Sequence, residues 1–347
     1  GLSILTSPLG NFVLYMGTIL LYWYGGRDVI LGNLTIGQLS GLTSYLTELL
    51  SRVLMMANLS VMFSRSMVSF HRLLEVVETE PEICDGPGTL PVQDGSISFR
   101  DVEFGYAGSP ILMKNLSLSI PSGQTVGIIG GTGSGKSSLV NLIPRLYDVS
   151  DPEMITIGGR SIREYPLGVL REGIACVPQD NFLFSDTIHN NIAFGSADKS
   201  AESVIHAAQL ACIHDNIAAF PEQYQTVVGE RGVTLSGGQK QRSSIARALM
   251  KDAPILILDD ALSAVDTDTE RKILDNLRTV RGGDRTTIIV AHRISTIQDA
   301  DHILVLDDGR VEEYGTHEEL LKNDGLYKSL FEKQQLEKQL REEGREG

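Results

Sequence analysis

The chain has 347 residues, of which 42% are hydrophobic and 21% charged, and this length allows two domains or one domain with an extension. Its formal net charge is −14, and nearly all of the excess negative charge lies beyond residue 80, because residues 1–80 hold four arginines against five acidic residues. This distribution argues against a nucleic-acid-binding protein, which would be expected to present a basic face.

The first predicted element is a membrane-spanning helix over residues 8–24. The stretch from Gly1 to Gly26 has no charged residue, and the apolar core of a bilayer needs about 20 helical residues. Tyr22, Trp23 and Tyr24 end this stretch, as is typical of the membrane–water boundary, although core packing is an alternative for such a group. A cleaved signal peptide is disfavoured, because no basic segment precedes the stretch and no small-residue cleavage site follows it.

A second span is predicted over residues 37–58, after a short outer loop at 25–36. Its apolar residues recur at steps of three and four, the period of a helix. A helix continuing to about Val77 would be roughly 60 Å long, about twice the bilayer core. Arg65 and Arg72 then place its second half in the cytoplasm as a stalk. We expect both spans to be apolar, without distinctive charges.

Residues 78–93 are rich in proline and glycine and have little periodicity, which indicates a linker. Beyond them, over residues 94–335, short aliphatic strands alternate with helix-like stretches, the pattern of an α/β domain with a largely parallel sheet. Residues 336–347 form a charged helical tail.

The clearest motif is a glycine-rich loop of the form GxxxxGK[ST], which directly follows an aliphatic strand and precedes a helix. Its glycines let successive N–H groups converge on phosphate oxygens, and the following helix adds its positive end. Lys136 would reach the terminal phosphates and the Ser137 hydroxyl would ligate Mg²⁺. A chance match is disfavoured by the strand and helix around the loop. The predicted nucleotide-binding residues are Gly130, Gly131, Thr132, Gly133, Ser134, Gly135, Lys136, Ser137 and Ser138.

A second aliphatic strand, residues 255–258, leads into Asp259 and Asp260. In nucleoside-triphosphate enzymes of this architecture, the first such aspartate holds Mg²⁺, so we assign Asp259 to the metal. A pair of solvated charges at a strand end is the alternative, and the neighbouring phosphate loop makes it the weaker one.

Between these motifs lies a further glycine-rich helix start, in the segment VTLSGGQKQRSSIARALM at residues 233–250, and it is again suited to a phosphate. This segment resembles the signature sequence of ATP-binding cassette (ABC) transporters. In that family two cassettes pair head to tail, and each signature caps the ATP on the other's phosphate loop. The resemblance implies that the signature residues Ser236, Gly237, Gly238 and Gln239 contact the ATP of a partner subunit.

Further segments agree with the family in order and spacing. Tyr106 matches the aromatic residue that stacks on adenine, although a lone tyrosine is more often part of a core. Gln179 matches the glutamine that contacts Mg²⁺ and water and senses the membrane domain. His292 matches the histidine that contacts the γ-phosphate, although a lone histidine after a strand is more often structural. Residues 226–232 resemble the loop before the signature in exporters, and residues 263–266 resemble the turn that crosses the dimer interface.

Family cassettes usually carry glutamate where this chain has Asp260, and that glutamate polarises the attacking water. Aspartate is shorter by one methylene, and a displacement of about 1 Å can cost on the order of 10²-fold in rate. Either the backbone or a water compensates, or this site hydrolyses ATP slowly. In the family, such a loss is typical of heterodimeric exporters whose two ATP sites differ and whose altered subunit keeps an intact signature.

The preceding helices resemble, less specifically, the last two of six transmembrane helices of an ABC exporter. We therefore expect the C-terminal part of a longer half-exporter: residues 1–77 from an all-α membrane domain, followed by an α/β P-loop ATPase cassette with a helical subdomain. The resemblance implies ATP and Mg²⁺ as cofactors and a multi-pass location in the plasma membrane with a cytoplasmic cassette. It also implies a second half-exporter as partner, a heterodimer being favoured and a homodimer possible.

The sequence leaves three alternatives to an active exporter subunit. A weakened ATP-binding subunit that regulates an active partner stays open because of Asp260. A DNA-maintenance ATPase would carry a long coiled-coil insertion between Lys136 and Ser236, where only a helical subdomain fits. An importer ATPase would normally be a separate chain without the apolar helices of residues 1–60.

Overall fold

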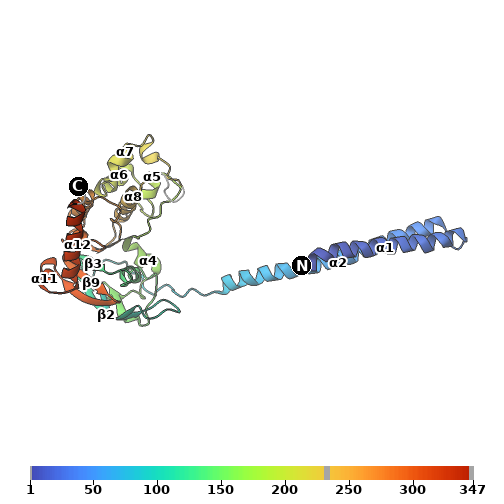
Figure 1. Ribbon diagram of the computed structural model, residues 1–347, viewed down its shortest axis with the longest axis horizontal. Coiled ribbons are helices and arrows are strands. Elements are labelled where there is room, and N and C mark those ends of the chain that lie inside the picture. The colour runs from blue at the N-terminus through green and yellow to red at the C-terminus, as the bar shows by residue number, and fades with distance from the viewer. Residues whose placement is uncertain (1, 230–234, 344–347) are drawn as a thin grey trace. The chain divides into compact units, whose positions relative to one another are not determined.

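The computed structural model describes residues 2–229 and 235–343 of the chain. The chain divides into two compact units, Gly1–Glu82 and Ile83–Gly347, which Figure 1 draws in the colours of the chain order. Of the segment 226–232 that was expected to precede the signature, residues 230–232 lie outside the described residues. Each unit is described here by itself.

The first unit is a hairpin of two long helices, α1 (Leu2–Ile30) and α2 (Ile36–Glu78). The helices pack through glycines of α1 that face leucines of α2. A Cβ on Gly10 would lie 2.3 Å from Leu54, and one on Gly25 would lie 2.3 Å from Leu39. Small residues let helix backbones approach closely, as in membrane domains. The pairing of an early glycine with a late leucine makes the two helices antiparallel.

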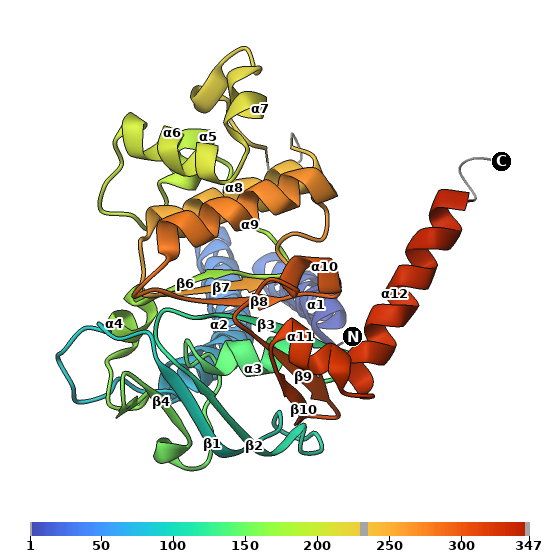
Figure 2. The ribbon, with the colours of Figure 1, turned by 90° about the vertical axis from the view of Figure 1, so that its left-hand side faces the viewer.

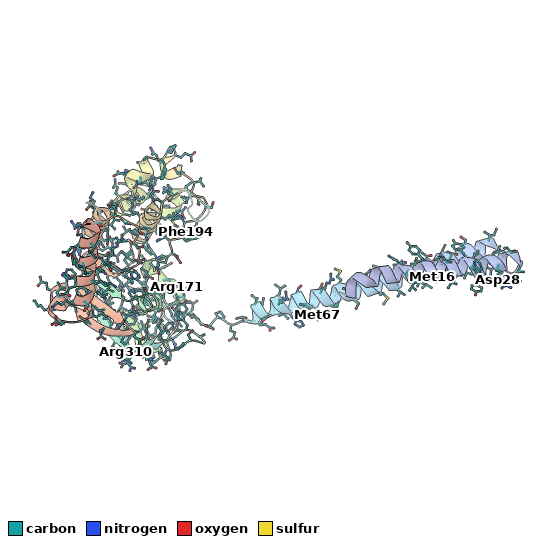
Figure 3. All side chains as sticks on the ribbon, in the orientation of Figure 1. Met16, Asp28, Met67, Arg171, Phe194 and Arg310 are labelled. Atoms are coloured by element: carbon teal, nitrogen blue, oxygen red, sulfur yellow. The ribbon has the colours of Figure 1, made fainter. Side chains whose placement is uncertain are left out.

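The turn between the helices is shorter than the loop expected at 25–36. α1 continues through Arg27 and Asp28 to Ile30, and Asp28, labelled in Figure 3, lies at the closed end of the hairpin. The backbone oxygen of Asp28 accepts hydrogen bonds from Asn33 N at 2.9 Å and Leu34 N at 3.3 Å. A capping box of Thr35 and Gln38 then starts α2.

Within the described residues, α2 is the one helix that is long and apolar enough to cross a membrane by length and composition. The expectation of spans without distinctive charges is wrong for it. Glu48 and Arg52 lie inside the predicted span 37–58 and form an ion pair of 3.4 Å one helical turn apart. The surrounding residues keep the helical apolar period, which is why the sequence pattern does not reveal the pair.

The second unit contains two sheets. A smaller antiparallel sheet has the order β2-β1-β4-β5, and a larger one has the order β10-β9-β3-β8-β7-β6. All neighbouring strands of the larger sheet are parallel except β9 and β10. The strands are β1 (Ile97–Phe104), β2 (Met113–Ile120), β3 (Thr125–Gly130), β4 (Ile155–Ile157), β5 (Arg160–Ser161), β6 (Ile174–Val177), β7 (Ile255–Asp259), β8 (Thr286–Val290), β9 (His302–Asp307) and β10 (Arg310–Gly315).

Helices cover both faces of the larger sheet. Figure 2 shows α8 and α9 on one side of β6, β7 and β8, with α5, α6 and α7 beyond α8, and α3 on the other side. The helices are α3 (Lys136–Leu142), α4 (Leu167–Glu172), α5 (Ile188–Ile192), α6 (Ala201–Leu210), α7 (His214–Ala218), α8 (Gly237–Met250), α9 (Thr267–Arg281), α10 (Ile294–Ile297), α11 (His317–Lys322) and α12 (Leu326–Glu343), with short 3₁₀ turns at Pro152–Met154 and Gln223–Gln225.

The aliphatic strand β7 lies between two hydrophobic cores and contributes side chains to both. Ile255 and Ile257 belong to the core that contains α3 and the smaller sheet. Leu256 and Leu258 belong to the core that contains α8 and α9. A strand buried on both faces is expected to read as a continuous apolar run, and the predicted α/β cassette with a largely parallel sheet and a helical subdomain is confirmed.

Part of the predicted linker 78–93 is attached to the second unit. Cys84 O accepts a hydrogen bond of 2.9 Å from Arg145 Nη1, and Gly88 N donates to Glu164 O at 2.7 Å. A Cβ on Gly88 would lie 2.5 Å from that same oxygen. The compact second unit therefore begins at residue 83, ahead of the expected domain start at 94.

Candidate nucleotide-binding site

The predicted site residues follow the carboxyl ends of neighbouring parallel strands. The register pairs Val177 of β6 with Leu258 of β7, and Asp259 of β7 with Val290 of β8. In open α/β sheets ligands bind in the crevice outside this edge. Asp260 comes directly after β7, and Gln179 and His292 lie two residues after the ends of β6 and β8.

The phosphate loop connects the end of β3 with the start of α3. Gly133 and Gly135 have φ angles of 82° and 98°, which only glycine adopts without cost. A Cβ on Gly130 would lie 2.0 Å from Leu306 O of the neighbouring strand β9. The loop tip, Gly131–Gly133, is exposed, whereas Ser134 to Lys136 are buried. The tip therefore leaves its backbone N–H groups open to a ligand.

Lys136 extends under this loop. Its Nζ donates to Gly130 O at 2.9 Å and to Gly131 O at 2.8 Å, and the residue is only 6% exposed. Burial lowers the pKa of Lys136, and the carboxylates of Asp259 and Asp260 oppose this shift. An ammonium group has three donors, so two of them stiffen the loop and the third is available to a phosphate oxygen.

Two of the three residues predicted to contact the metal, Ser137 and Asp259, lie next to each other, whereas Gln179 is bonded to neither. Ser137 Oγ donates to Asp259 Oδ1 at 3.3 Å, so the register of α3 against β7 brings the two predicted ligands together. Burial raises the pKa of the Asp259 carboxyl, and the charge of Asp260 adds to this rise, while Ser137, Lys136 and His292 oppose it. The net effect is a carboxylate whose charge is costly until a cation is present.

These ligands fit Mg²⁺. Hydroxyl and carboxylate oxygens suit this ion, which usually keeps several waters and is completed by the phosphates of its substrate. Within residues 2–229 and 235–343, no three His, Cys, Asp or Glu residues gather into a metal-binding group. Two protein oxygens beside a phosphate loop are the donor set expected for a metal that arrives with a nucleotide.

Asp260 has a backbone conformation that the sequence did not reveal. Its φ of 50° is left-handed, a region in which Asp and Asn are several-fold enriched among non-glycine residues. Its N–H donates to Val290 O at 3.0 Å, and its own carbonyl accepts from Ser263 Oγ at 3.0 Å. A cavity of about 230 Å³ is lined by Asp260, His292 and Arg293, which brings two of the three predicted catalytic residues, Asp260 and His292 but not Gln179, to one space.

Gln179 and Tyr106 lie at the margins of the site. Gln179 is exposed, and its backbone oxygen accepts from Asn181 Nδ2 at 3.4 Å. Within the described part of the chain, its side chain forms no hydrogen bond with the other predicted residues. The Tyr106 hydroxyl is 2.8 Å from Ser138 Oγ. This bond joins the predicted adenine-stacking ring to the helix that follows the phosphate loop.

The signature residues bond within their own helix start. Ser236 caps α8: Gln239 N donates to Ser236 Oγ at 3.3 Å, and Gln239 Oε1 accepts from Ser236 N at 2.9 Å. A Cβ on Gly238 would lie 2.7 Å from Ala264 O, whereas one on Gly237 would meet only an ordinary contact of 3.7 Å. None of the hydrogen bonds recorded for the described signature residues reaches the phosphate loop of the same chain.

Comparisons with known proteins agree on one family. Residues 113–263 match the family described as ABC transporter. A bacterial Atm1-family ABC exporter solved with ATP bound has a TM-score of 0.84 and 39% sequence identity, over 96% of this chain and 59% of that one. Residues 113–263 therefore belong to the ABC transporter family.

Relatives of this ABC transporter chain include export proteins. The ATP-dependent lipid A-core flippase of Syntrophus aciditrophicus is 40% identical over 344 residues, which are 99% of this chain and 57% of the relative. A Bacillus subtilis protein described as a multidrug export ATP-binding/permease protein is 41% identical over 334 residues, 95% of this chain and 57% of the relative. The chain thus spans little more than half the length of the curated relatives it matches.

Two residues of the ABC cassette were missed from the sequence. Tyr147 lies edge-on to Tyr106, with ring centroids 5.1 Å apart, and both rings are partly exposed. Gln241 is buried in α8, donates to Ser263 Oγ at 3.0 Å and accepts from Ala264 N at 2.9 Å. An aromatic residue after α3 was the available signal for Tyr147, whereas Gln241 gave none.

Proposed function

We propose that this chain is the ATP-binding and ATP-hydrolysing part of an ABC-type exporter subunit. The observation that carries the proposal is the approach of Ser137 Oγ to Asp259 Oδ1 at 3.3 Å beside the buried ammonium of Lys136. Mg²⁺, when bound, would neutralise charge that develops on the phosphates. Lys136 would orient the terminal phosphates, and Ser137 and Asp259 would hold the metal.

Asp260 and His292 are proposed to act on the attacking water. Both line the cavity of about 230 Å³, so one side chain can accept the proton of the water while the other contacts the γ-phosphate. A positioned acid or base contributes typically 10²–10⁴-fold to a rate. Gln179, two residues after Val177, which pairs with Leu258 of β7, would contact the metal and report on the membrane domain.

The partner is proposed to be a second half-exporter that pairs head to tail with this one. The signature helix α8 is long enough to carry a helix dipole at its N-terminus, and its first residues are bonded only within α8 among the described contacts. A phosphate from another subunit would complete this end. The short carboxylate of Asp260 favours a heterodimer with one slow site, and a homodimer is the alternative.

In the first unit, we propose that a polar face of α2 lines the interior of a multi-pass membrane domain. Ser40, Ser44, Thr47 and Ser51 recur at helical steps, with the Glu48–Arg52 pair beside them. A groove of about 670 Å³ runs along these residues. Ionisable residues within membrane spans almost always face the bundle interior or a water-filled cavity. This face supports export of a molecule with polar groups.

The cassette also has a surface suited to the cytoplasmic loops of a membrane domain. Phe182 and Phe184, in the loop before α5, and Phe194, in the loop after it, are exposed, and Phe194 is labelled in Figure 3. Phe184 and Phe194 have ring centroids 4.4 Å apart, and Arg247 lies over both rings. We propose that a cytoplasmic loop of the membrane domain docks on these rings. The first of them, Phe182, comes three residues after Gln179.

The decisive experiment is nucleotide binding by the purified protein with Lys136→Ala. Loss of the ammonium should weaken the affinity for a fluorescent ATP analogue at least about tenfold, because Lys136 is the buried cation of the loop. The matched control is Lys338→Ala, which removes an exposed lysine of α12 and should leave the affinity unchanged. Equal affinity in Lys136→Ala and the wild type would contradict the proposed function.

A second candidate function rests on Asp260. The protein would bind ATP tightly and hydrolyse it slowly, acting as a regulated clamp beside an active partner. Single-turnover hydrolysis distinguishes the two: a subunit with a competent site converts its bound ATP during one catalytic cycle of the pair, whereas a clamp keeps ATP bound over many cycles.

A further inference from the structure

The turn that carries His292 is held by a side chain from the C-terminal helix α12. Gln334 Nε2 donates to His292 O at 2.8 Å, and Gln334 Oε1 accepts from Ile294 N at 2.9 Å. The orientation of the amide is fixed, because a carbonyl needs a donor and an N–H needs an acceptor. One glutamine therefore bridges the backbone on both sides of Arg293.

This bridge replaces a helix cap. Ile294 is the first residue of α10, and its N-cap residue, Arg293, makes no side-chain capping bond. The first N–H groups of a helix have no partner within the helix. The Arg293 side chain is engaged elsewhere, with Ser263 O at 3.3 Å and Glu270 at 3.6 Å. Gln334 supplies the missing acceptor from a different helix.

α12 is well anchored up to this point and exposed after it. Tyr327 at its start is fully buried, and its hydroxyl is 2.6 Å from His317 Nδ1. Phe331 packs against the same core as α10. Beyond Gln334, Leu336 and Leu340 are 57% and 60% exposed. Gln334 is thus placed by the anchored half of α12, close to where the packing of this helix ends.

We propose that Gln334 is a positioning residue for His292, and this inference rests on the proposed function. Its two hydrogen bonds fix the backbone on either side of the histidine turn, so that the imidazole faces the cavity shared with Asp260. A misplacement of a catalytic group by about 1 Å can cost about 10²-fold in rate. The C-terminal helix, which contributes no residue to the cavity, thereby bears on hydrolysis.

Hydrogen–deuterium exchange of the nucleotide-free protein tests the bridge without using activity. In Gln334→Leu both bonds are lost, and the amide of Ile294 should exchange roughly three to ten times faster, as expected for one hydrogen bond. Gln334→Glu keeps the acceptor and should retain the protection of Ile294. The neighbouring exposed residue gives the control, because Gln335→Leu should leave the exchange unchanged. Equal exchange in Gln334→Leu and the wild type would overturn the proposal.

Steady-state kinetics of the reconstituted exporter test the consequence for His292. Gln334→Leu and Gln334→Glu should each lower kcat at least about fivefold, with KM for ATP within about twofold of the wild type, since both lose the bond to His292 O. The thermal midpoint should remain close to the wild type. An equal fall of kcat in Gln335→Leu, or an unchanged kcat in both Gln334 variants, would overturn the positioning role. A wild type without ATPase activity would instead contradict the proposed function, and the exchange of Ile294 would still decide whether Gln334 holds the turn.

Discussion

Gln241 and Ala264 join the signature helix to the turn behind Asp260. Gln241 Oε1 accepts from Ala264 N at 2.9 Å, and Gln241 Nε2 donates to Ser263 Oγ at 3.0 Å. Both contacts come from a buried side chain of α8, close to the glycines expected to bind ATP. We therefore expect a movement of the signature helix to displace the turn at residues 263–266 through these two hydrogen bonds.

We expect Gln241→Leu to destabilise the cassette, because it leaves Ala264 N without its acceptor. A buried donor left without a partner costs about 1–3 kcal/mol, which corresponds to a lower thermal midpoint of about 2–12 °C in a domain of this size. Gln241→Glu keeps the acceptor for Ala264 N and should lose less. A midpoint of Gln241→Leu equal to that of the wild type would contradict this role.

The two signature glycines should respond differently to alanine. Gly238→Ala should lower the thermal midpoint, because its Cβ would lie 2.7 Å from Ala264 O. Gly237→Ala has ordinary space at 3.7 Å, so it should leave the midpoint unchanged and still reduce ATP hydrolysis by the assembled pair. Thermal unfolding and steady-state ATPase assays of both variants test this. If Gly237→Ala lowered the thermal midpoint as much as Gly238→Ala does, the loss of ATP hydrolysis in Gly237→Ala could not be separated from a loss of stability, and the prediction would be wrong.

Asp259→Asn should stabilise the nucleotide-free protein while abolishing Mg²⁺-dependent ATP hydrolysis. Burial raises the folded-state pKa of Asp259, so its contribution to stability is fully present below the unfolded pKa and is lost as the pH rises through the folded pKa. The neutral amide avoids this loss and still accepts from Ser137. The thermal midpoint of Asp259→Asn should therefore exceed that of the wild type at pH 7, and the difference should shrink as the pH is lowered through the folded-state pKa. A thermal midpoint of Asp259→Asn below that of the wild type at pH 7 would contradict the prediction that the Asp259 charge destabilises the nucleotide-free protein.

Asp260→Glu should raise turnover at the slow ATP site of a heterodimer, because it restores the missing methylene. Asp260→Asn should then reduce total activity less than a change of Ser236 or Gly237 does, since those residues complete the partner's competent site. Steady-state hydrolysis by the reconstituted pair is the assay. Loss of all activity in Asp260→Asn, with signature variants still active, would make Asp260 a working base and this chain an ordinary active half-exporter.

The polar face of α2 can be tested by cysteine labelling in membranes. Ser44→Cys and Ser51→Cys should react with a water-soluble thiol reagent faster than Leu49→Cys and Val53→Cys, which lie on the opposite side of the helix by the period of 3.6 residues. Labelling is counted above that of the native cysteines. Faster reaction at Leu49→Cys than at Ser44→Cys would contradict the proposal that the polar face of α2 lines an aqueous path.

The sequence predicted those parts of the site that depend on local chemistry. The phosphate loop and the strand before Asp259 are contiguous motifs, and β7 and α3 bring Ser137 and Asp259 together as their order implied. Gln241 and Gln334 could not be found in this way. Each acts through a backbone segment more than 20 residues away, and a polar side chain on a helix usually indicates a solvated face.

The backbone of Asp260 and the attached linker were missed for the same physical reason. The left-handed φ of Asp260 follows from its bonds to β8 and to the turn after it, neither of which leaves a residue pattern. The proline- and glycine-rich segment was predicted as a linker from its composition, but composition does not reveal the pairing of Gly88 with Glu164.

The position of β7 between the two hydrophobic cores has a consequence for how the cassette unfolds. Ile257 belongs to the core that contains α3, and Leu258 belongs to the core that contains α8, so the same five-residue strand supplies side chains to both cores. If one core loses its packing, one face of β7 becomes exposed. The strand is then held less firmly, and the packing of the second core is weakened as well. Cooperative units in proteins are defined by such shared packing. The two layers of the cassette should therefore melt together, in one transition, rather than in two steps.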